Sequence, residues 1–131
     1  MLGKIHIYIG IAIVIVFLLT GQYMHHNFNH LKDMEPMNRA LFRAGHLYIL
    51  LFGLINISLG AYFKPIEHKL FEKIQLLASI IVFIASFLVI LGFFQELPSK
   101  EMDRPITRYS LYVILLGVSM HGLISLIKNK R

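Results

Sequence analysis

The chain has 131 residues, 56% of them hydrophobic, and a mean hydropathy of +0.67, which is too apolar for an ordinary soluble domain of this length. The formal net charge is +6, but the basic residues lie beside apolar runs, where they suit phospholipid headgroups, and no nucleic-acid-binding role is indicated. The sequence contains no cysteine, so disulfides and thiolate ligands are excluded.

Four windows of the sequence are long and apolar enough to cross a bilayer as helices. A hydrocarbon core about 30 Å thick needs about 20 helical residues at about 1.5 Å each. Helices satisfy their own backbone hydrogen bonds in lipid, whereas an open sheet leaves N–H and C=O groups unpaired. The sequence therefore predicts an all-α membrane protein, a single four-transmembrane-helix bundle over residues 1–131, with spans at 5–23, 44–63, 74–94 and 109–127.

The first window follows Lys4, as the apolar core of a secretory signal peptide would. The run Ile5 to Leu19 is longer than a usual signal core, and no Ala-x-Ala site follows it. We therefore interpret this window as a span that stays in the protein. Four spans place both termini on one side of the membrane, which we call the terminal side, and the segments after the first and third spans on the other, which we call the far side.

The segment after the first window is rich in side chains that bind metals: Met24, His25, His26, His30, Met34 and Met37, with His46 inside the next window. Imidazole binds copper, zinc, iron and nickel, and thioether adds a preference for Cu(I), so this combination without cysteine favours copper or haem iron. His26 and His30 are four residues apart, which on one helical turn would place both beside one ion. The alternative is an amphipathic segment that lies on the headgroups.

Arginines precede the second and fourth windows. Arg39 and Arg43 share a helix face with His46, and Arg104 and Arg108 repeat the spacing before the fourth window. The sequence therefore predicts an anion site of up to four guanidinium groups at the far-side mouth, beside two helix N-termini, for phosphate or carboxylate groups of a lipid, a haem or a substrate. The alternative is that these arginines hold lipid headgroups and set topology.

The same two entries align with each other. Met37-Asn38-Arg39 and Gly53 correspond to Met102-Asp103-Arg104 and Gly117, with one residue fewer in the second copy. This pattern indicates two duplicated helical hairpins in parallel orientation, related by an axis along the membrane normal.

Polar residues inside the spans need partners. His6 and His121 come from different windows, and two such imidazoles could hold a haem iron axially. For His121 the competing interpretation is a neutral ring bonded to a backbone carbonyl, and for Asn56 it is an interhelical hydrogen bond. The four windows contain no acidic residue, which disfavours an ion pump driven by carboxylates.

Small residues indicate where the helices pack closely: Gly45, Gly53, Gly60, Ala78, Ala85, Gly92, Gly117 and Gly122. Asp103 and Pro105 are typical of the start of a helix, as N-cap and early helical residue. These residues predict packing seams along the second, third and fourth spans.

In architecture the predicted bundle is similar to small four-helix haem b membrane proteins. The stretch Arg43-Ala44-Gly45-His46 also resembles the Arg-Ala-His segment in the second helix of membrane glutathione-transferase-like enzymes. The Asn and Glu pattern that follows in those enzymes is missing from Leu47 to Gly60, which contains Asn56 and no acid.

Three functions follow from these patterns. The first is a membrane protein that binds copper, another transition metal or haem b at the far side. The second is an accessory or scaffolding subunit that binds lipid, another membrane protein or a second copy of itself. The third is a small enzyme that acts on an anionic amphipathic substrate held by Arg43 and Arg108.

We place the protein in a bacterial cytoplasmic membrane. Lys128, Lys130 and Arg131 crowd one helix end, which favours both termini in the cytoplasm.

Overall fold

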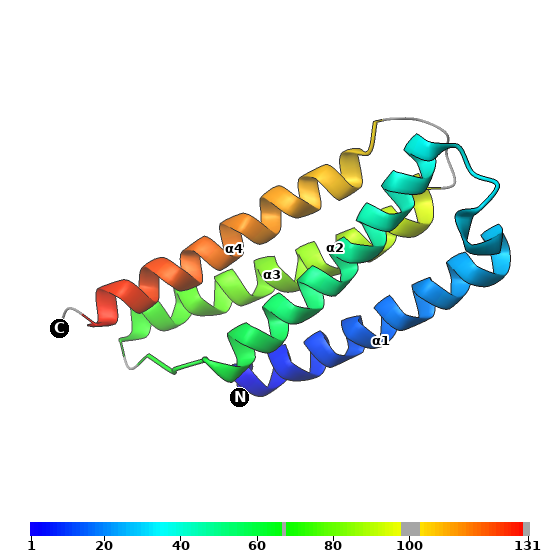
Figure 1. Cartoon of the computed structure of the whole chain (residues 1–131). Coiled ribbons are helices and arrows are strands. Elements are labelled where there is room, and N and C mark those ends of the chain that lie inside the picture. The colour runs from blue at the N-terminus through cyan, green and yellow to red at the C-terminus, as the bar shows by residue number, and fades with distance from the viewer. Residues whose placement is uncertain (67, 98–102, 130–131) are drawn as a thin grey trace.

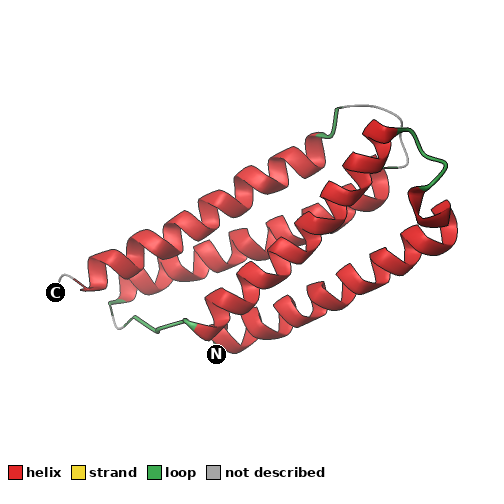
Figure 2. Cartoon of the chain, viewed as in Figure 1, coloured by secondary structure: helices red, strands yellow, loops and turns green. Residues whose placement is uncertain are grey.

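The computed structural model describes all residues except 67, 98–102 and 130–131. It contains four long helices, α1 (Leu2–Phe28), α2 (Pro36–Ala61), α3 (Lys69–Glu96) and α4 (Pro105–Asn129), with a short 3-10 helix, η1 (Asn29–Leu31), after α1 (Figure 2). None of the described residues lies in a strand, so the prediction of an all-α chain is confirmed.

Each of the four helices is long and apolar enough to cross a membrane by length and composition. The helices continue past the predicted windows: α2 begins at Pro36 rather than residue 44, and α4 at Pro105 rather than residue 109. Proline is tolerated in the first turn of a helix because the N–H that it lacks has no helical partner there. The arginines before both windows therefore lie within or next to helical turns.

The helices form two antiparallel hairpins. α1 packs along α2, α3 packs along α4, and the hairpins meet mainly where α2 faces α3 (Figure 1). Both described chain ends lie at the terminal side, and the α1–α2 connection lies at the far side. Lys130, Arg131 and Met102, which entered the orientation and repeat arguments, lie outside the described residues.

Glycines let the first two helices approach closely. A Cβ on Gly10 would lie 2.8 Å from the carbonyl oxygen of Gly53, and a Cβ on Gly60 would lie 2.6 Å from that of Gly3. Because no side chain fits there, the backbones of α1 and α2 touch along this seam. Gly53 and Gly60 are residues of the predicted seams, and their partners on α1 are glycines too.

The apolar core lies between the hairpins. It includes Ile49 and Phe52 of α2 and Val82, Val89 and Phe93 of α3, all buried. The large apolar side chains on the outer faces are exposed, as expected where lipid is the solvent.

Candidate functional site

A left-handed turn at the far side brings two histidines together. Asn29, His30 and Leu31 have φ angles of 46°, 56° and 62°, which cost about 1–2 kcal/mol each for residues other than glycine. Leu31 is buried in the core and anchors the turn. The turn brings the His30 ring against the His25 ring, with the ring centroids 3.7 Å apart and the ring planes tilted by 52°. The two Nδ1 atoms lie 3.1 Å apart and share a hydrogen bond.

The other predicted ligands of this segment have different surroundings. The His26 ring lies 4.7 Å from that of His25, centroid to centroid. Met24 and Met34 are half-buried and pack against the apolar core. Over the part of the chain that the structure describes, no three His, Asp or Glu side chains are placed to hold one metal ion.

His46 does not join the loop histidines. Its ring stacks on Phe17 with centroids 4.0 Å apart, and its Nδ1 lies 2.9 Å from Thr20 Oγ1. The Thr20 hydroxyl donates to the Phe17 carbonyl, so the imidazole must donate through Nδ1–H. His46 therefore joins α2 to α1 within the seam.

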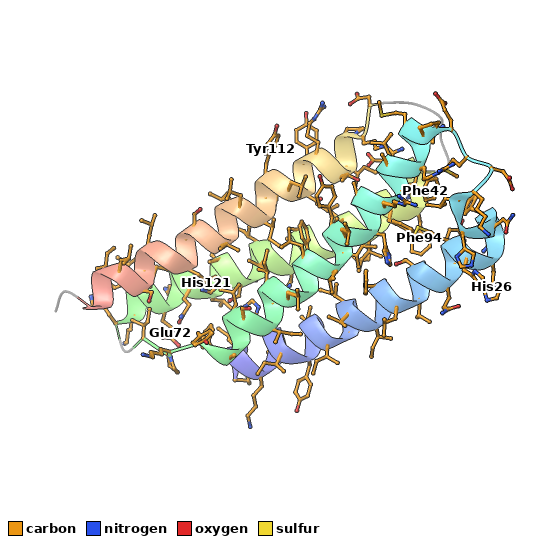
Figure 3. All side chains as sticks on the ribbon, in the orientation of Figure 1. His26, Phe42, Glu72, Phe94, Tyr112 and His121 are labelled. Atoms are coloured by element: carbon orange, nitrogen blue, oxygen red, sulfur yellow. The ribbon has the colours of Figure 1, made fainter. Side chains whose placement is uncertain are left out.

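A cavity of about 640 Å³ opens beside the α1–α2 connection, and we call it the far-side cavity. His26, Met34, Asp33 and Glu35 are among its lining residues, and Phe42 of α2 contributes an aromatic wall. Figure 3 shows His26 and Phe42 at this end of the bundle. The sequence drew attention to His26 and Met34 but not to the two acids.

The four arginines of the predicted anion site have separate surroundings. Arg39 donates from Nη2 to the Lys32 and Met34 carbonyls at 2.9 and 3.0 Å, and so supports the loop. Arg43 is exposed. Arg104 and Arg108 do line one groove between α2 and α4.

Acidic groups accompany the two arginines in that groove. Arg108 pairs with Asp103 at 3.3 Å. Burial lowers the pKa of Arg104, and the nearby Glu96 carboxylate partly offsets this. The nitrogens Nε and Nη2 of Arg104 are buried without a hydrogen-bond partner.

Glu96, at the end of α3, was not singled out by the sequence. Its carboxylate accepts hydrogen bonds from the backbone N–H groups of Ile106 and Thr107 and, at 2.7 Å, from the Thr107 hydroxyl. It therefore satisfies the first free amides of α4, the role that the sequence predicted for Asp103. Glu96 lies ten residues before Ile106, so no local sequence pattern at the start of α4 identifies Glu96 as the capping residue.

A second polar cluster lies inside the bundle near the terminal side, and it takes residues from all four helices. His6 Nδ1 is 3.0 Å from Asn56 Oδ1, and His6 Nε2 is 3.0 Å from Ser79 Oγ. His121 Nε2 approaches the same Ser79 oxygen at 3.2 Å. Asn56 Nδ2 donates to Ser86 Oγ at 2.9 Å. We call these five residues the buried polar network.

The hydrogen bonds of this network have a direction. Asn56 presents its oxygen to His6, so the imidazole donates from Nδ1 and, when neutral, accepts at Nε2. Ser79 Oγ also donates to the Gln75 carbonyl at 3.0 Å, so this carbonyl and His6 Nε2 compete for its one proton, while its lone pairs can accept from His121 Nε2. Both ring nitrogens of His6 and both polar atoms of the Asn56 side chain lie within hydrogen-bond distance of a partner, as buried polar groups require.

The network bears on the haem prediction. The His6 and His121 rings lie 5.7 Å apart, centroid to centroid, and both Nε2 atoms face one serine oxygen. The two nitrogens already have a shared partner, so a porphyrin between the rings would have to displace Ser79. His121 bonds to a side chain rather than to the backbone carbonyl of the competing interpretation.

Comparison with known proteins adds no assignment: no protein-family model, curated protein or solved structure matches this chain. The far side offers the strongest geometric indication of function, because His25 and His30 contact each other there, next to residues that line the far-side cavity.

Proposed function

We propose that this protein is a small membrane binding protein that holds one transition-metal ion at the far side, with His25 and His30 as its first two ligands. One observation carries the proposal: the two Nδ1 atoms lie 3.1 Å apart. Histidine nitrogens bind such ions at about 2.0–2.1 Å, which puts two nitrogens of a tetrahedral ion about 3.3 Å apart. The pair thus has the spacing that one ion requires, and binding would replace the Nδ1–Nδ1 hydrogen bond and turn both nitrogen lone pairs toward the ion.

The same spacing favours some ions over others. A linear two-coordinate Cu(I) ion would separate its two nitrogens by about 4 Å. Tetrahedral Zn(II) or tetragonal Cu(II) fits the 3.1 Å spacing better. His26, a thioether from Met24 or water would complete the coordination.

The turn that creates the pair supports the proposal. His30 lies within three left-handed residues, and backbone strain of this kind is found where a site requires it. The free energy of metal binding would offset the conformational cost of the three non-glycine residues there.

The experiment is metal analysis of the detergent-purified chain after loading with Zn(II) or Cu(II) and desalting. We expect about one ion per chain, and less than a tenth of that in the His25→Ala/His30→Ala variant. His68→Ala is the matched control, because His68 is an exposed histidine at the terminal side.

Two results would overturn the proposal: wild-type protein that retains no metal, or a double variant that retains as much as the control. Either result would favour the accessory-subunit hypothesis, in which the far-side histidines can be replaced without loss of folding or partner association.

The orientation and the internal repeat complete the proposal. We propose that the far side faces away from the cytoplasm of a bacterial cell, with the basic end of α4 inside, and that the two hairpins are duplicated copies. The outward side is where a cell first meets an external metal ion. Accessibility of single cysteines introduced at Lys4 and Asp33 in intact cells would test the orientation.

A further inference from the structure

We propose that the far-side cavity binds a small organic ammonium ion with an apolar body. The cavity, of about 640 Å³, is large enough for a ligand of a dozen or so heavy atoms. Two of its lining residues, His26 and Phe42, lie at the end of the bundle that holds the α1–α2 connection (Figure 3).

One wall of the cavity is aromatic. Phe28 and Phe42 both line it, with ring centroids 5.0 Å apart and the rings tilted by 53°. Met34 and Leu97 extend this apolar surface. Such a wall buries an alkyl or aryl group, and the faces of aromatic rings also attract a cation.

The charge of the lining selects for cations. Asp33 and Glu35 line the cavity, and none of its described lining residues is Lys or Arg, although the whole chain carries a formal charge of +6. Local negative charge on a basic protein attracts a positively charged ligand to this point.

The neighbouring amides supply further acceptors. Asn29 donates from Nδ2 to Asp33 Oδ2 at 3.2 Å, and Asn27 donates from Nδ2 to the Tyr23 carbonyl at 3.1 Å. Both Asn side chains line the cavity, and each has one N–H engaged and a carbonyl oxygen available as an acceptor. An ammonium group with N–H donors matches the two carboxylates and two amide oxygens, whereas a carboxylate or phosphate would be repelled by Asp33 and Glu35 and would meet only the second N–H of each amide.

Arg39 lies close to this loop but does not line the cavity. Its Nη2 is bound to the Lys32 and Met34 carbonyls. The guanidinium thereby holds the backbone on either side of Asp33 in position. It does not pair with the Asp33 carboxylate, which lines the cavity.

Isothermal titration of the detergent-purified protein, with a metal chelator present, tests the proposal. The probe is 2-phenylethylammonium, and 2-phenylethanol is its uncharged counterpart. We expect saturable binding of the amine, at least tenfold weaker binding of the alcohol, and at least tenfold weaker amine binding to the Asp33→Asn/Glu35→Gln variant. Asp103→Asn is the matched control, because Asp103 is a far-side acid that pairs with Arg108 outside the cavity.

Circular dichroism and size-exclusion chromatography will show whether the double variant is folded. If it is not, the single Glu35→Gln variant replaces it, with an expected loss of about threefold or more, since the Glu35 side chain is exposed. Equal binding of amine and alcohol, or equal affinity in the acid variants and in Asp103→Asn, would overturn the proposal. Amine binding that persists in His25→Ala/His30→Ala separates this site from the proposed metal site, so either proposal can fail alone.

Discussion

The imidazole of His6 donates to Asn56 across 3.0 Å, and this bond joins the first turns of α1 to the interior of α2 within the predicted span. Both side chains are fully buried. A polar group in lipid has no water to replace a lost partner, so each bond of the buried polar network helps to fix which helix faces which.

Ser79 is the residue on which this network depends most. Its oxygen contacts His6 and His121 at 3.0 and 3.2 Å, so Ser79→Ala removes the partner of two buried rings at once. We expect the free energy of unfolding to fall by about 1–3 kcal/mol. Unfolding by SDS in mixed micelles measures it, with Ser119→Ala on the exposed face of α4 as the control. Equal stability of the two variants would show that the network is not needed for stability.

Glu96 is predicted to hold the start of α4. In Glu96→Gln one of the two carboxylate oxygens becomes an N–H₂ donor, so one of the two amides, that of Ile106 or that of Thr107, loses its acceptor. We expect a loss of about 0.5–2 kcal/mol, as for a removed N-cap. Hydrogen exchange of at least one of the two amides should be faster in Glu96→Gln, and exchange of both should be unchanged in Asp103→Asn; the reverse order would identify Asp103 as the capping residue.

The number and type of the helices could be predicted because lipid imposes one requirement on every span. About 20 apolar residues and a self-satisfied backbone leave few alternatives, so hydropathy alone located α1 to α4. The ends of the helices could not be predicted as well: α2 begins at Pro36 because polar residues such as Arg39 continue the helix beyond the apolar window.

The site was predictable in its residue types and not in its geometry. The density of histidines after the first span pointed to His25 and His30, but their contact depends on three left-handed residues that no propensity predicts. The spacing argument instead paired His26 with His30 on a helical turn, whereas the structure ends α1 at Phe28. No sequence pattern pointed to Asp33, because a cavity formed by the end of one helix and the start of another leaves no local pattern.

The seam between α1 and α2 should not tolerate a side chain at Gly10. A Cβ there would lie 2.6 Å from Ile57 Cγ1 and 2.8 Å from the Gly53 carbonyl oxygen, so Gly10→Ala must push the helices apart. We expect a loss of about 1–3 kcal/mol in the SDS assay. At Gly122 nothing lies within 4 Å of a built Cβ, so Gly122→Ala should leave stability unchanged or raise it by up to about 1 kcal/mol. Similar losses in both variants would mean that helix packing at the seam is loose.

Thr20 is predicted to fix the tautomer of His46. Its hydroxyl donates to the Phe17 carbonyl and leaves only its oxygen for His46, which therefore carries its proton on Nδ1. Thr20→Val keeps the shape of the side chain but removes this acceptor, and the ring should then shift toward the tautomer protonated at Nε2. Nitrogen-15 NMR of the labelled histidine distinguishes the two forms, and His121, which is far from Thr20, serves as the internal reference. A wild-type ring already protonated at Nε2 would contradict the hydrogen-bond assignment, because Thr20 would then have to donate to the imidazole and leave the Phe17 carbonyl.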